Sequence, residues 1–141
     1  MKRLLSLTLV ILMAFPCMAL AAQPEEIAPY ASNYFTSYGT SLGNQGNGVI
    51  LITFSTTGTG ICDTIGVANF WVERRDDNGN WENVTGVVPG QTASGVVTYT
   101  FSKYFQGVPG ETYRVQVVFI SLRNGGGETK SYTSATIKAR R

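Results

Sequence analysis

From Asn33 onward, hydrophobic and polar residues alternate in short runs that are separated by clusters of Gly, Asn, Asp and Pro. The runs are rich in Val, Ile, Thr, Tyr and Phe, which favour β-strands. We predict strands over 34–42, 49–56, 65–75, 81–88, 95–102, 112–122 and 129–139. About seven strands, with turn signals every ten or so residues and no convincing helical period between them, predict an all-β antiparallel β-sandwich.

The same alternation predicts which side chains enter the core. The side chains expected to point inward are Ile50, Ile52, Phe54, Phe70, Val72, Val97, Tyr99, Phe101, Tyr113, Val115, Val117, Phe119, Ala135 and Ile137. Residues 57–63 are expected to form a Gly-rich loop that holds Cys62 half-buried. Residues 76–80 predict a hairpin between two strands, and Asn78-Gly79 is its strongest short-range signal.

The turn before strand 112–122 carries the clearest architectural signal. Pro109 and Gly110 deliver Tyr113 to the start of that strand. This resembles the tyrosine corner of immunoglobulin-like sandwiches, in which the Tyr hydroxyl bonds back to backbone a few residues upstream.

Most of the segment 49–139 resembles a fibronectin type III domain. The likeness rests on Phe70-Trp71-Val72-Glu73-Arg74 before a hairpin and Trp81, and on 108–117 before a Gly-rich turn. Phe54 stands where that family usually has a core Trp, and the family's N-terminal Pro-rich signature is absent. The whole chain also resembles a family of small secreted bacterial proteins with a domain of unknown function, and that resemblance implies no activity.

The first residues predict export from the cell. Lys2 and Arg3 precede an apolar run over 4–15, and Ala19-Leu20-Ala21 offers small residues for signal-peptide cleavage. We therefore expect a bacterial-type signal peptide at 1–21, a flexible segment at 22–32 and an immunoglobulin-like or fibronectin-like sandwich at 33–141. The expected location is secreted or extracellular, and retention at the cell surface stays open.

Charge and composition bear on possible partners. The chain has 11 Lys+Arg and 9 Asp+Glu, so removal of Lys2 and Arg3 leaves 9 of each sign. A neutral domain has no long-range field toward nucleic acid or an anionic membrane. We expect no nucleic-acid partner, no membrane span in the mature chain and a monomer.

Catalytic chemistry has little support in the sequence. The chain has no His, which removes Ser-His-Asp and Cys-His catalysis and the commonest zinc sites. The acidic turn 76–80 has oxygen ligands beside a Gly but lacks the spacing of an EF-hand loop, so we interpret it as a polar hairpin tip. We expect no enzyme activity, no cofactor and no metal.

One outward-facing group supports a functional hypothesis. If strands 65–75 and 112–122 are neighbours, their outer positions form a candidate binding face, which consists of Trp71, Glu73, Arg75, Arg114, Gln116, Val118 and Ile120. Trp and Arg are enriched at binding hot spots. The alternative is ordinary sheet cover, with Arg114 stacked on Trp71 and the N-terminal segment laid over the aliphatics.

The favoured function is therefore a non-catalytic binding or adhesion-type module. Its expected partner is an extracellular protein, engaged through this face or by edge-strand addition. A glycan partner is the alternative, and the aromatic residues expected to stack on sugars are Tyr30, Tyr34, Tyr38 and Trp81.

Overall fold

The computed structural model describes residues 32–141. The predicted signal peptide and residues 22–31 lie outside the described residues. The described part of the chain consists of strands, turns and loops, and contains no helix long and apolar enough to cross a membrane.

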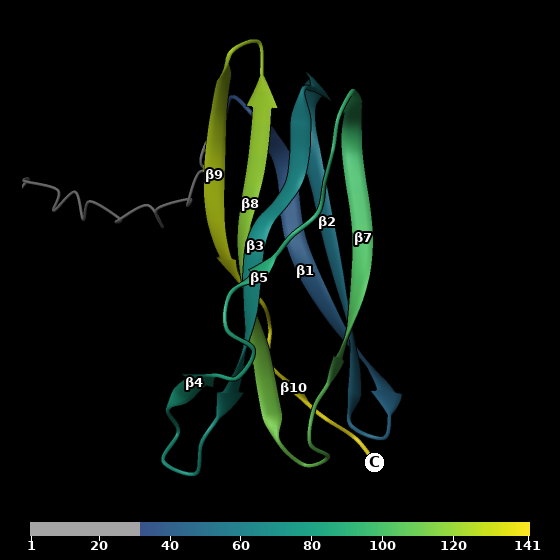
Figure 1. Ribbon diagram of the computed structural model, residues 1–141, viewed down its shortest axis with the longest axis vertical. Helices are drawn as coiled ribbons and strands as arrows, with labels where there is room; N and C mark the ends of the chain where they lie inside the picture. Colours follow the sequence, from purple (N-terminus) through teal and green to yellow (C-terminus); the bar gives the residue numbers. More distant parts are fainter. Residues whose placement is uncertain (1–31) are drawn as a thin grey trace, which may run out of the picture. The chain divides into compact units, whose positions relative to one another are not determined.

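These strands form two antiparallel sheets, as predicted (Figure 1). The three-stranded sheet has the order β1-β2-β7, with β1 at Phe35–Gly46, β2 at Val49–Cys62 and β7 at Val96–Gln106. The larger sheet is built around the adjacent strands β3 (Thr64–Arg75) and β8 (Thr112–Arg123). The protein is an all-β sandwich, compatible with the immunoglobulin-like and fibronectin type III architectures.

Shorter strands flank this central pair. β9 pairs with β8, β10 pairs with the start of β8, and three short strands pair with β3. Their bounds are β4 Trp81–Asn83, β5 Val88–Pro89, β6 Thr92–Ala93, β9 Gly126–Thr133 and β10 Ile137–Lys138.

The core lies between the two sheets and is filled by alternate residues of the long strands. Ile50, Ile52 and Phe54 face it from β2, and each is no more than 1% exposed. The inward positions of β3 and β8 are filled as predicted by Phe70, Val72, Tyr113, Val115, Val117 and Phe119. The alternation therefore fixes the faces of all three central strands.

The tyrosine corner is present. Tyr113 is 2% exposed, and its hydroxyl accepts a hydrogen bond of 2.8 Å from the backbone N–H of Val108. The ring also excludes any side chain at Gly107, where a Cβ would lie 2.9 Å from Tyr113 Cε2. This hydrogen bond ties the turn to the first inward residue of β8 and so fixes the register of that strand.

The loop predicted over 57–63 is wrong, because β2 continues to Cys62. Gly58 lies against Cys62, and a Cβ there would sit 2.4 Å from Cys62 Sγ. The glycine therefore allows a close approach and a ladder irregularity inside a strand, as glycines in strands often do. Cys62 is correspondingly 1% exposed, where we had predicted a half-buried loop residue.

Val97 does not enter the core. Its side chain is 41% exposed, because it lies opposite the irregularity between Thr57 and Cys62 in the β2–β7 ladder. Tyr99 and Phe101, farther along β7, are partly buried and stack on one another.

The strand predicted over 81–88 is also broken. Asn83 Oδ1 accepts hydrogen bonds from the backbone N–H groups of Thr85 and Gly86, and Gly86 has a φ of 68°. This side-chain-stabilised turn ends β4, and ladder pairing with β3 resumes at β5.

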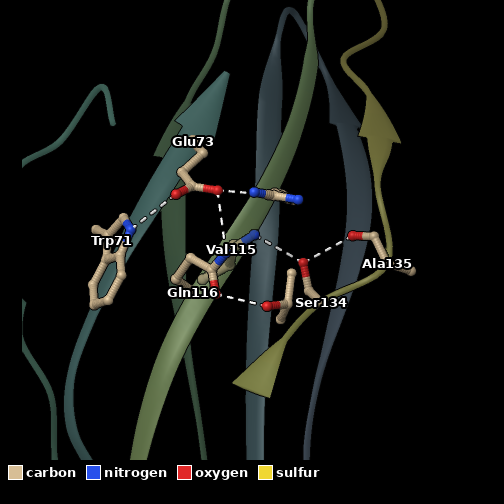
Figure 2. A network of polar contacts seen from close by, with 8 residues as sticks. Trp71, Glu73, Val115, Gln116, Ser134 and Ala135 are labelled. Carbon is tan, nitrogen blue, oxygen red and sulfur yellow. Dashed lines mark hydrogen bonds and ion pairs between the residues drawn. The ribbon is translucent and has the colours of Figure 1, made fainter. Parts of the chain in front are cut away.

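The strand predicted over 129–139 is divided into β9 and β10, and Ala135 is exposed. Ser134 occupies the buried position at the break, with 6% exposure. Its hydroxyl accepts a hydrogen bond from Val115 N–H and donates one to Ala135 C=O, each 2.8 Å long (Figure 2). The Ser134 N–H still donates to Val115 C=O at 2.9 Å, so the side-chain hydroxyl replaces a backbone carbonyl only as the acceptor for Val115 N–H.

Candidate functional site

The candidate binding face lies on the outer side of the larger sheet. The β3–β8 ladder places Trp71 opposite Gln116 and Glu73 opposite Arg114. Phe70 and the other inward residues of β3 are buried, so Trp71 and Glu73 project from the opposite side of the sheet. The sequence alternation therefore brings four of the seven predicted residues together.

Glu73 is the centre of a hydrogen-bond network (Figure 2). Its Oε2 accepts from Arg114 Nε at 2.5 Å and from Gln116 Nε2 at 3.2 Å, and its Oε1 accepts from Trp71 Nε1 at 3.2 Å. Thr133 of β9 extends the network by donating its hydroxyl to Gln116 Oε1 at 2.7 Å. One carboxylate thus holds three side chains from two strands in fixed positions.

The protonation of Glu73 follows from this arrangement. The Glu73 side chain is only 14% exposed, and this burial raises its pKa. The hydrogen bonds from Arg114, Gln116 and Trp71 favour the charged form more strongly, so the net pKa of Glu73 is lowered from 4.5. The carboxylate is therefore ionised at neutral pH and serves as a fixed acceptor.

Arg114 stacks on Trp81, whereas the sequence led us to consider stacking on Trp71. Its guanidinium carbon lies 4.2 Å from the centre of the Trp81 ring. The hairpin explains this contact, because it pairs Arg75 with Trp81 and returns the Trp to the same outer face. The loop spans residues 76–80, whereas a two-residue turn at Asn78-Gly79 would have paired Arg75 with Glu82 and placed Trp81 on the other face.

The remaining predicted residues spread along the face and do not join the network. Arg75 is exposed at the hairpin end of β3. Val118 and Ile120 lie half-buried farther along β8, opposite Asn69 and Gly66 of β3. The face therefore has a polar, aromatic end and an aliphatic end.

The acidic hairpin tip is occupied by its own backbone. Asp76 Oδ1 accepts hydrogen bonds from the N–H groups of Asn78 and Asn80, at 2.9 and 2.8 Å. Within residues 32–141, no three His, Cys, Asp or Glu side chains gather in a group that could hold a metal ion.

The aromatic residues considered for sugar stacking have different environments. Tyr34 and Tyr38 are partly buried against the core, and the Tyr38 ring packs on Phe119 with centroids 5.4 Å apart. Tyr30 lies outside the described residues, and Trp81 is covered on one side by Arg114. In the described part of the chain these residues do not form an open aromatic row.

The outer side of the three-stranded sheet is chemically different. Hydroxyl pairs link β2 and β7 there, and they are Thr53–Ser102, Ser55–Thr100 and Thr57–Thr98. The separations are 2.9, 3.3 and 3.3 Å. This hydroxyl-rich face supplies matched control positions for experiments on the candidate binding face.

Comparison with protein-family models, with curated proteins and with solved structures finds no match to this chain.

Proposed function

We propose that this chain is a non-catalytic binding module that acts outside the cell and engages a protein partner through the candidate binding face. The observation that carries the proposal is the ordered arrangement of Trp71, Glu73, Arg114 and Trp81 on one sheet face. Trp and Arg are the residue types that most often dominate binding energy at protein interfaces. The features of a signal peptide at 1–21 support the extracellular setting.

The side chains of this face are already ordered, which favours binding. Binding through long side chains normally costs about 0.5–1.5 kcal/mol for each one that must be immobilised. Trp71 and Arg114 are already held by Glu73, and Arg114 is also held by Trp81. A partner that contacts them would therefore lose less affinity to side-chain ordering.

The fold supports the proposal by analogy alone. The tyrosine corner and the two sheets suit a fibronectin type III or immunoglobulin-like origin, and many cell-surface recognition domains share this architecture. Because sandwiches host many functions, the binding role rests on the face itself.

Edge-strand addition is the second way to bind a protein, and β1 is the edge best suited to it. Its sequence, FTSYGTSLGNQG, has no charged residue and no Pro, and among the described strands it pairs with β2 alone. In the larger sheet, the edge strand β9 carries Glu128 and Lys130 at its partly buried positions. Inward-pointing charges of this kind discourage strand pairing.

The test is capture of a partner from culture supernatant on the immobilised mature protein, followed by calorimetry with the purified partner. Trp71→Ser should weaken binding about 30-fold or more, as expected for loss of a hot-spot residue of about 2 kcal/mol. Ile120→Ser tests the aliphatic end of the same face. Ser102→Ala, on the hydroxyl-rich face, is the matched control and should bind as the wild type does.

Circular dichroism must show that each variant is folded. Equal binding by folded Trp71→Ser, Ile120→Ser and wild-type protein would refute the use of this face. Recovery of a polysaccharide in place of a protein would support the glycan alternative.

A further inference from the structure

A small apolar pocket opens between the two sheets, on the side where β7 faces β5. Its volume is about 210 Å³. Core residues Ile52, Phe70 and Val72 form its buried part, while Phe105 and Val88 are half-buried at its sides. The pocket therefore reaches the hydrophobic core directly.

The local fold explains why the pocket is open. β5 is only two residues long, and it pairs with β3 through Phe70 and Val88. Within residues 32–141, no strand pairs with β7 on the side away from β2. The sandwich therefore lacks a continuous strand that would cover Phe70 and Val72 along this edge.

Among the described residues that line this pocket, Lys103 is the one with a charge. On β7 the partly buried positions alternate as Phe101, Lys103 and Phe105, so the lysine occupies a place on the inner side of the sheet. Its ladder partner is Ile52, which is 1% exposed. A half-buried lysine in such a place lays its stem on apolar surface and keeps its ammonium close to water.

The ammonium group of Lys103 has no counter-charge in the described part of the chain. The ion pairs there involve Arg74 with Glu82, Arg114 with Glu73, and Lys130 with Glu128. No hydrogen bond within residues 32–141 involves Lys103 Nζ either. An apolar pocket thus lies beside a cation that can receive an anion.

We propose that this pocket binds a small monocarboxylate whose single apolar group is about the size of a phenyl ring, with the carboxylate paired to Lys103. The size follows from the volume of about 210 Å³, since a dry apolar cavity of roughly 150 Å³ accommodates benzene. A charge-assisted contact between ammonium and carboxylate fixes the orientation of the ligand. The same chemistry occurs in free aryl-alkyl acids and in a polypeptide that ends in an aromatic residue.

Lys103 could instead protect the edge of the sheet. A charge that points inward from an edge strand discourages pairing with another strand. That role requires no apolar pocket beside the lysine, and it predicts no affinity for a carboxylate. The proposal is independent of the candidate binding face, because Trp71 and Glu73 project from the other side of β3.

The experiment is a titration of the isotopically labelled mature protein with hydrocinnamate, followed by amide NMR. We expect saturable shifts centred on Phe70, Val72 and Phe105. The alcohol that corresponds to hydrocinnamate keeps the ring but lacks the charge, and should bind about tenfold more weakly, as loss of one charged hydrogen bond implies. A peptide ending in a free phenylalanine carboxylate, compared with its amide, shows whether the polypeptide source fits.

Two lysine variants test whether Lys103 binds the carboxylate or only discourages strand pairing at the β7 edge. Lys103→Met keeps the stem and should lower hydrocinnamate affinity about tenfold, to that of the alcohol. Lys138→Met, at an exposed position on β10, is the matched control and should leave the affinity unchanged. The proposal fails if no saturable shifts occur around the pocket, or if folded Lys103→Met binds hydrocinnamate as tightly as the wild type.

Discussion

Replacement of Tyr113 by Phe should destabilise the protein through loss of a single hydrogen bond. The ring would keep its place, including its edge-on contact with Phe105 at a centroid distance of 5.1 Å. The backbone N–H of Val108 would lose its acceptor, which now lies 2.8 Å away. We expect a cost of about 1–2 kcal/mol, since a donor left without its partner usually costs about 1–3 kcal/mol and exposed Val108 lets water offset part of this loss.

Urea unfolding followed by circular dichroism measures this change. With a slope near 1–2 kcal/mol per molar urea, the midpoint should fall by about 1 M while the slope stays unchanged. Amide hydrogen exchange at Val108 should accelerate as well, because its protecting bond is gone. Tyr104→Phe is the control, since the Tyr104 side chain on β7 is 73% exposed and its change should be close to neutral.

If Tyr113→Phe has the same urea midpoint as Tyr104→Phe, the corner hydrogen bond contributes nothing measurable. The register of β8 would then have to be attributed to the alternation of its apolar side chains alone.

Three further changes test other parts of the fold. Thr40→Val should stabilise the protein by about 1 kcal/mol in urea unfolding, because Thr40 Oγ1 is buried and has no hydrogen-bond partner within residues 32–141. Thr36→Val should destabilise it by a similar amount, because the Thr36 hydroxyl donates to the carbonyl of Gly58 in β2. Changes of the same sign in the two variants would contradict this prediction. Glu73→Gln should lower the free energy of unfolding near neutral pH. The difference in stability between this variant and the wild type should shrink as the pH falls below 4.5. Folding lowers the pKa of Glu73, so its carboxylate stabilises the fold above the unfolded pKa and loses that effect as it protonates. A difference independent of pH would show that the Glu73 charge does not stabilise the fold. Ser134→Ala should cost about 1–3 kcal/mol in thermal unfolding, since a buried amide of β8 loses its acceptor, and an unchanged melting temperature would contradict that role.

Short-range patterns were sufficient to predict the central strands. The positions of Tyr113 and Phe70 follow from alternation, and the corner follows from a turn only a few residues away. Each of these signals lies within one strand and its adjoining turn, so no knowledge of the partner strand is needed.

The errors arose where a distant strand determines the local structure. Gly58 looks like a loop residue until it pairs with Phe35 of β1, and Val97 is exposed because of an irregularity in the neighbouring strand. Ala135 is exposed, and the buried position at the break is taken by Ser134, whose hydroxyl accepts from Val115 N–H of β8. The same limit concealed the contact of Arg114 with Trp81, which depends on hairpin register and sheet order together.

The location of the tryptophans gives the protein a built-in optical probe. The chain has two Trp residues, Trp71 and Trp81, and both belong to the outer side of the β3–β8 sheet around Arg114. Intrinsic fluorescence excited at the indole band therefore reports on that one surface. A partner that docks there should shift the emission without any label, whereas a carboxylate bound between the sheets should leave it nearly unchanged. One spectrum can thus distinguish occupation of the two proposed sites.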